Sequence, residues 1–176
     1  SATSVHVAGK SSQGPLSITL NLDMASNGGR GQISLVGLSF ELIRVGNVLY
    51  LKGNSAFFKR LGVAVHVPQG MWLKAPANSG QMAQLAAFTD LSGELNRLLS
   101  RTGPTTKGAS TTVNGQKAIE LKESAKLFSG SLYIATTGKP YPIKIVKHGR
   151  ESGQTTFSGW DGPVSLSAPP NAIAIR

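Results

Sequence analysis

The stretch LSITLNLDM, residues Leu16–Met24, alternates strictly between apolar and polar side chains. Because successive side chains of a strand point to opposite faces, this pattern predicts a strand with one apolar face. Three further strand-like runs follow at residues 32–35, 39–45 and 48–52, and the turns between them are rich in Gly and Asn. Runs spaced so closely predict an antiparallel meander, whose long apolar face has to be covered by another part of the chain.

The rest of the chain divides into a central helical block and a second block of strands. Helices are expected at residues 56–61, 81–88 and 91–101, and strands at 4–8, 111–113, 117–122, 131–136, 141–148, 154–160 and 164–167. The turn Asn114-Gly115 suits a type I′ hairpin. Two blocks of strands separated by helices indicate an α+β fold of about ten strands and two or three helices. We expect a single domain over residues 1–170 and a C-terminal tail over 171–176.

The charge balance points to anionic partners, since 18 Lys and Arg face only 8 Asp and Glu, a net charge of +10. The cations are spread along the chain, and several alternate with apolar residues, as in Ile143–Lys147. Most of them therefore belong to the solvent face of strands. Aromatic residues make up 6% of the chain, and no stacking motif or recognition helix is apparent. We expect an anionic headgroup or a membrane surface as a partner, and no nucleic acid.

The sequence contains none of the usual motifs that indicate catalysis or metal binding. The chain has no Cys, which excludes disulfides and thiol chemistry. Its three histidines, His6, His66 and His148, lie far apart and show no metal-ligand spacing. The segment GPTTKG at 103–108 begins like a phosphate loop, but Ala109 stands where the lysine is needed. The sequence therefore predicts neither an enzyme nor a metal or cofactor site.

The apolar residues of the meander and of the helices remain as the candidate site. They either fill a solid core or line a cavity, and periodicity does not separate these two interpretations. A sheet curved around helices, with space between them, would hold acyl chains through burial of their CH₂ groups. The candidate lining residues are Leu20, Leu22, Leu35, Phe40, Phe57, Phe58, Leu61, Met82, Leu85, Phe88, Leu91, Leu95 and Leu98.

Several short segments occur in a characteristic order along nearly the whole chain. They are GNVLYLK (46–52), WLK (72–74), VNGQKAI (113–119), LYI (132–134), KPYPIKI (139–145) and FSGWDGPV (157–164). In this order the chain resembles the LppX/LprG group of actinobacterial envelope lipoproteins and, more remotely, the LolA/LolB lipoprotein carriers. The resemblance implies a half-barrel of antiparallel strands with helices on its concave face. It also implies a hydrophobic cavity for lipids or lipidated glycans, export to the cell envelope, and an anchoring lipidated Cys just upstream of Ser1.

Three hypotheses for the function follow. The leading one is non-catalytic binding and transport of a lipid or lipidated glycan in the periplasm, by a monomer. The first alternative is a filled half-barrel that acts as an envelope sensor or protein-interaction module. The second alternative is a hydrolase on lipid or cell-wall substrate, which requires a convergent Ser, His and acid.

Overall fold

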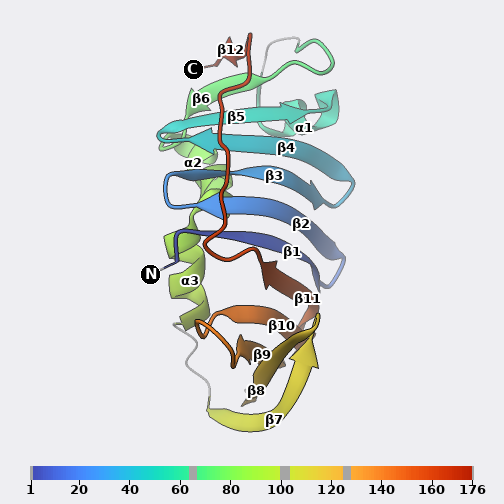
Figure 1. The fold of residues 1–176 in the computed structure, drawn as a ribbon. Helices are drawn as coiled ribbons and strands as arrows, with labels where there is room; N and C mark the ends of the chain where they lie inside the picture. The colour runs from blue at the N-terminus through green and yellow to red at the C-terminus, as the bar shows by residue number, and fades with distance from the viewer. Residues whose placement is uncertain (1, 64–66, 100–103, 125–127, 176) are drawn as a thin grey trace.

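A computed structural model describes the chain except for residues 1, 64–66, 100–103, 125–127 and 176 (Figure 1). Within the described residues, twelve strands form one curved sheet that does not close, in the order β12-β6-β5-β4-β3-β2-β1-β11-β10-β9-β8-β7. Neighbouring strands are antiparallel, except that β12 runs parallel to β6. Helices from the middle of the chain cover one face of the sheet (Figure 1). The α+β half-barrel expected from the sequence is confirmed, with twelve strands in place of about ten.

The strands fall into two blocks, as predicted. The first comprises β1 (Ser4–Gln13), β2 (Leu16–Ala25), β3 (Gly28–Leu35), β4 (Leu38–Val45), β5 (Val48–Gly53) and β6 (Leu73–Pro76). The second comprises β7 (Thr105–Val113), β8 (Gln116–Ser124), β9 (Phe128–Ala135), β10 (Pro142–Gly149) and β11 (Glu151–Ser158), and β12 (Ile173–Ala174) ends the chain. The helical elements are α1 (Ser55–Arg60), α2 (Gly80–Ala86), the 3-10 turn η1 (Ala87–Thr89) and α3 (Leu91–Leu99).

Strand register brings the apolar side chains onto the face that the helices cover, here called the inner face; the opposite one is the outer face. One row of directly paired residues crosses the inner face from β11 to β6 and consists of Phe157, Val7, Leu22, Gly31, Leu42, Leu51 and Leu73. The six side chains in this row are each no more than 3% exposed. The alternation seen in residues 16–24 therefore sets the core, because a slip of one residue would turn this row to the outer face.

The helical layer is fixed to the sheet where η1 meets β3 and β4. Thr89 is fully buried and packs against Gly29, where an added Cβ atom would stand 2.9 Å from the Cβ of Thr89. Arg44 reaches across from β4, and its Nε donates to Thr89 Oγ1 at 2.8 Å and its Nη2 to the Thr89 carbonyl oxygen at 3.0 Å. Gly29 thus permits the close approach of Thr89 to the sheet, and the hydrogen bonds from Arg44 hold Thr89 in that position.

The predicted helices are present with shifted ends. Asn54 caps α1, since its Oδ1 accepts a hydrogen bond from the Phe57 backbone N–H at 2.8 Å. The helix expected at 81–88 divides into α2 and η1, and α3 begins at Leu91 as predicted. The expected continuation of α3 to residue 101 lies outside the described residues. The turn Asn114-Gly115 has positive φ at both residues, which confirms the type I′ hairpin.

The strand predicted at residues 164–167 is not formed. Those residues belong instead to a segment, residues 159–172, that crosses the outer face from β11 towards β6 (Figure 1) and is called the strap below. Val164 and Leu166 in the strap are half-buried and alternate with exposed neighbours, which explains the strand-like pattern. After the strap, Ile173 pairs with Leu73, so the segment expected as a tail carries the edge strand β12.

The packing predicts a large contrast between two Leu→Ala substitutions on neighbouring strands. Leu22 is 2% exposed and Leu35 is 38% exposed. Leu22→Ala should lower the free energy of unfolding by about 2–5 kcal/mol, because it leaves a cavity in the core row. Leu35→Ala, the matched control, should cost less than about 1 kcal/mol. Urea unfolding at pH 7 measures both, and equal losses would contradict the assigned inner row.

Candidate functional site

The inner face of the second strand block is apolar and incompletely covered. Strand register places Ile119 opposite Ile134, and Leu121 opposite Leu132, which in turn pairs with the buried Ile145. These four residues of β8 and β9 are only half-buried. Leu132 packs against the core, whereas the other three do not belong to the core cluster. This part of the sheet therefore presents apolar side chains with surface left to bury.

A hollow of about 540 Å³ opens at the end of the same strands, near the β7–β8 and β9–β10 turns. Its apolar lining consists of Val113, Tyr141, Ile143, Phe157 and Trp160. The ring of Trp160 stacks on Tyr141, with centroids 4.5 Å apart, and lies 6.1 Å from Phe157. The Trp160 indole N–H donates to the carbonyl oxygen of Pro142 at 2.8 Å. An aromatic wall thus continues the apolar inner face to the rim of the sheet.

One carboxylate organises the rim of this hollow. Asp161 accepts hydrogen bonds from Lys139 Nζ at 2.7 Å, from the Tyr141 hydroxyl at 2.8 Å, and from the Thr3 backbone N–H at 2.9 Å. The hydrogen bond from Lys139, followed by those from Thr3 and Tyr141, holds the pKa of Asp161 well below its usual range. Asp161 therefore joins the strap, the β9–β10 turn and the N-terminal segment.

The predicted lining residues lie together on the inner face, mostly in well-packed surroundings. Leu22, Phe40, Phe57, Phe58 and Leu91 belong to the buried core, where Phe40 and Phe57 stack with centroids 4.3 Å apart. Six more are partly buried against that core: Leu20, Leu61, Met82, Leu85, Phe88 and Leu95. Leu35 is exposed, and the side chain of Leu98 lies outside the described residues. None of the twelve whose side chains are described lines the hollow beside Trp160.

The candidate lining residues named from the sequence do not include the half-buried residues of the second block. Leu132 and Ile134 alternate with Ser131 and Tyr133, and this pattern marked β9 as a strand with one apolar face. It did not show which part of the inner face the helices leave open, because that depends on where the helical layer docks. Trp160, Tyr141 and Phe157 fall in predicted strands and in the segments that carry the resemblance, but not among the candidate lining residues. Their convergence requires the fold.

On the outer face, Asp23 interacts with both His6 and Arg30, an arrangement that the sequence did not reveal. The His6 Nδ1–H donates to Asp23 Oδ1 at 2.7 Å, and Arg30 Nε donates to Asp23 Oδ2 at 3.2 Å. Burial raises the pKa of Asp23, but the hydrogen bonds from His6 and Arg30 outweigh it, and the pKa lies below its usual value. Among the described residues, no hydroxyl hydrogen-bonds to this imidazole.

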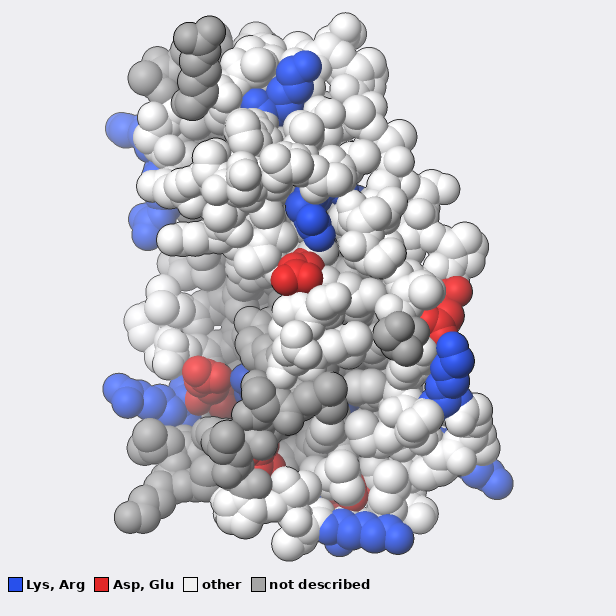
Figure 2. All heavy atoms as spheres, turned by 90° about the vertical axis from the view of Figure 1, so that its left-hand side faces the viewer, with Lys and Arg blue, Asp and Glu red and all other residues white. Residues whose placement is uncertain are grey.

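Within the parts of the chain that the structure describes, charged side chains and possible metal ligands add little to the candidate site. No group of three or more His, Asp or Glu side chains there is arranged to hold a metal ion. Lys and Arg side chains on the face seen in Figure 2 are interrupted by uncharged residues and in places lie beside acidic ones, and they form no continuous basic patch. None of the described helices has the length and apolar character needed to span a membrane.

The fold and this site define the class of protein: a curved antiparallel half-barrel with helices on its concave side. The structure is similar to that of LprF from Mycobacterium bovis, with a TM-score of 0.66 over 96% of this chain and 90% of that chain, at 14% sequence identity. The LppX/LprG-like resemblance expected from the sequence is thus confirmed for the fold. No protein-family model matches the chain, and no curated protein sequence matches it either.

Two further solved structures superpose more loosely. One is an uncharacterized conserved protein from Thermus thermophilus, with a TM-score of 0.46, 9% identity and coverage of 99% of this chain and 90% of that chain. The other is a putative outer membrane lipoprotein-sorting protein domain from Vibrio parahaemolyticus, with a TM-score of 0.28, 11% identity and coverage of 93% and 86%. The function has to be inferred from the site itself.

The Asp161 contacts predict a defined pH dependence of stability. A carboxyl group whose pKa is lower in the folded chain stabilises the fold above its unfolded pKa, about 3.9, and this contribution declines as the pH falls below that value. Asp161→Asn should therefore lower the melting temperature at pH 7, and the difference from the parent chain should shrink as the pH falls from 5 to 2.

Glu151→Gln is the matched control for this prediction, because it removes another carboxylate, one that pairs with Lys147 on the surface at 3.2 Å. Such exposed pairs contribute little to stability, so the control should leave the melting temperature nearly unchanged. Thermal unfolding followed by circular dichroism measures all three chains. A difference between parent and Asp161→Asn that stays constant over this pH range would contradict the role assigned to the carboxylate.

Proposed function

We propose that this chain is a non-catalytic protein that binds a lipid or lipidated glycan and carries it within the bacterial cell envelope. The observation that carries the proposal is the half-buried apolar inner face of β8 and β9, which lies beside the hollow lined by Trp160 and Phe157. Acyl chains fit such a surface because each CH₂ group removed from water contributes about 0.8 kcal/mol. The volume of about 540 Å³ falls within the range of roughly 300–1,000 Å³ typical of ligand pockets.

The location of the acyl chains follows from the division of the inner face. In the first strand block, α1 and η1 close over the sheet, and residues such as Phe57 and Leu42 are almost fully buried. In the second block, Ile119, Leu121 and Ile134 keep part of their surface exposed. The acyl chains therefore lie along β8 and β9, with the aromatic wall at the mouth.

The partner and the location of the protein are parts of the same proposal. Lys139 lines the mouth and can share its charge between Asp161 and an anionic headgroup. The likeness of the fold to that of LprF supports an exported envelope protein. Anchoring by a lipidated Cys upstream of Ser1, and function as a monomer, complete the proposal.

A filled half-barrel that senses or binds another protein is the second candidate. It is favoured by the tight packing of the predicted lining residues, since Leu22, Phe40, Phe57, Phe58 and Leu91 are at most 5% exposed. In that case the inner face would only stabilise the fold, and function would rest on the outer surface. The two candidates differ in a direct way, because only the first requires uptake of an acyl chain.

The test compares two apolar→Asn substitutions on one hairpin. Ile134 of β9 is half-buried on the inner face, whereas Val146 of β10 is half-buried on the outer face. Ile134→Asn should weaken the binding of a fluorescent C16 fatty acid at least fivefold, because a polar amide replaces part of the apolar surface. Val146→Asn should bind like the parent chain.

Fluorescence titration and native mass spectrometry of protein purified from an actinobacterial host measure the two effects. Circular dichroism confirms that both variants remain folded. A parent chain that carries no lipid and takes up no fatty acid would overturn the carrier function in favour of the filled half-barrel. Equal weakening by both substitutions would place the fatty acid elsewhere.

A further inference from the structure

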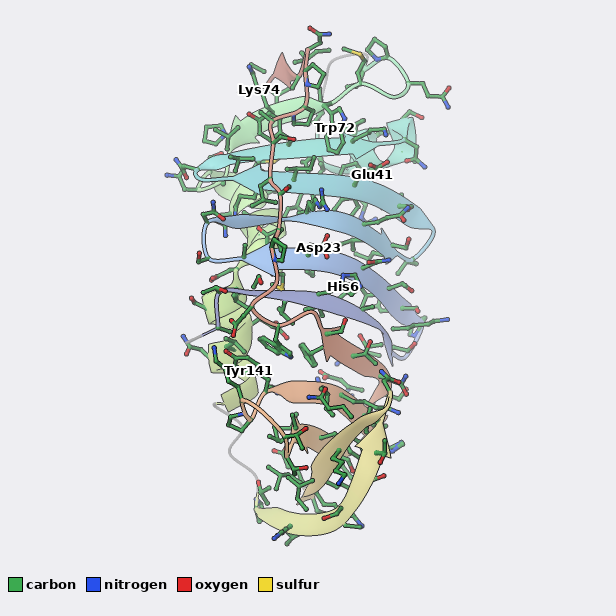
Figure 3. All side chains as sticks on the ribbon, viewed as in Figure 1. His6, Asp23, Glu41, Trp72, Lys74 and Tyr141 are labelled. Carbon is green, nitrogen blue, oxygen red and sulfur yellow. The ribbon has the colours of Figure 1, made fainter. Side chains whose placement is uncertain are left out.

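A second hollow, of about 330 Å³, lies on the outer face, on the opposite side of the sheet from the proposed lipid site. Its polar lining comes from three adjacent strands: Asn21 and Asp23 of β2, Arg30 and Gln32 of β3, and Glu41 of β4. Trp72, directly before β6, forms an aromatic wall. Figure 3 shows Asp23, Glu41 and Trp72 on the face that the strap crosses. The hollow is therefore built on rigid strands, with the loop residue Trp72 as its wall.

The hollow presents both donors and acceptors that the fold leaves available. Among the described residues, Asn21 makes no side-chain hydrogen bond, and Arg30 uses only its Nε, towards Asp23. Glu41 uses only Oε1, which accepts from Lys52 Nζ at 3.0 Å, and Gln32 donates from Nε2 to Ser39 and keeps its Oε1. A ligand in the hollow thus meets amide, guanidinium and carboxylate groups at one place.

Trp72 is held in position by its neighbours. Lys52 Nζ lies 5.5 Å from the centroid of the Trp72 ring, and the same ammonium group pairs with Glu41. The backbone carbonyl of Trp72 accepts a hydrogen bond from the Ile173 N–H at 2.8 Å, which ties this residue to β12. The electron-rich face of an indole attracts the weakly positive C–H groups of a sugar ring, while the hydroxyl groups of the ring remain free for hydrogen bonds.

The charges at the hollow cancel, although the chain as a whole is strongly basic. Asp23 and Glu41 carry two negative charges, and Arg30 and Lys52 carry two positive charges, with each carboxylate paired. An anion such as phosphate gains little where its cations are already paired with carboxylates. A neutral ligand with many hydroxyl groups satisfies the remaining donors and acceptors without a desolvated charge.

We propose that the outer-face hollow formed by Asn21, Arg30, Glu41 and Trp72 is a binding site for a neutral sugar unit of a glycan. The sugar ring stacks against Trp72, and its hydroxyl groups bond to the amide of Asn21, the free nitrogens of Arg30 and the Oε2 atom of Glu41. The site is independent of acyl-chain binding on the inner face. A protein with both sites would attach to a glycan while its inner face carries a lipid.

Indole N–H signals in NMR spectra of the full chain provide the test. The chain has two tryptophans, and Trp160, which lines the other hollow and whose N–H is bonded to the Pro142 carbonyl oxygen, serves as an internal control. Titration with cellotriose, maltotriose, mannotriose and chitotriose, each to 50 mM, should shift the Trp72 signal with at least one of the four. The Trp160 signal should stay unchanged, and added NaCl should have little effect because the ligand is uncharged.

Variants separate recognition from stability. Asn21→Ala should weaken the binding at least threefold without affecting the fold, since this side chain is exposed and makes no side-chain hydrogen bond to the rest of the described chain. Asn96→Ala, an equally exposed change on α3, is the matched control and should bind as the parent chain does. Trp72→Ala should abolish binding, and Trp72→Phe should retain part of it.

Three results would overturn the proposal. The first is that none of the four sugars shifts the Trp72 signal at 50 mM. The second is a shift that Asn21→Ala and Trp72→Ala leave unchanged. The third is a Trp72 shift produced by sodium phosphate in place of the sugars and weakened by salt, which would mark an anion site.

Discussion

The contact between Thr89 and Gly29, held by Arg44, determines how the helical layer lies on the sheet. Thr89 is fully buried; its hydroxyl donates to the Ala86 carbonyl oxygen at 2.6 Å and accepts from Arg44, which also donates to the Thr89 carbonyl oxygen. A buried carbonyl oxygen without a partner would be costly, so the guanidinium stabilises this docking point. Because η1 connects α2 to α3, its position decides which strands the helices cover, and hence which apolar residues stay accessible.

The inner face consequently has two parts with different physical character. Near β1–β5, residues from the sheet and from α1 interlock as in an ordinary protein core, and the stacked Phe40 and Phe57 rings are typical of it. Towards β8 and β9 the same face carries half-buried aliphatic side chains that continue into the aromatic wall at Trp160. In the proposed function, the β1–β5 part of the sheet stabilises the fold and the β8–β9 part of the same sheet binds the ligand.

The sequence predicted the elements well because their signals are local. Alternation over residues 16–24 and the Asn114-Gly115 turn each depend on neighbours in the chain, and each was found. Three features escaped because they depend on distant contacts. Gly28 and Gly29 lie between the runs predicted as strands at 16–24 and 32–35, but they belong to β3, where Gly29 makes room for Thr89. Val164 and Leu166 alternate like a strand but cover the outer face unpaired. Which part of the inner face stays open depends on where η1 docks on the sheet, and no local sequence pattern predicts that position.

The position of β1 in the sheet has a consequence for how the chain reaches its folded state. β1 pairs with β2, its neighbour in sequence, and also with β11, where His6 lies opposite Ser158. Among the described residues, the two strand blocks are joined in the sheet only through this pairing of the first strand with the second-to-last. During synthesis the β1 edge stays unpaired until residues 151–158 have emerged, and such an edge is prone to pair with other chains. Contacts between residues so distant in sequence also form slowly. The closing of β1 against β11 is therefore the step at which folding and aggregation of this protein compete.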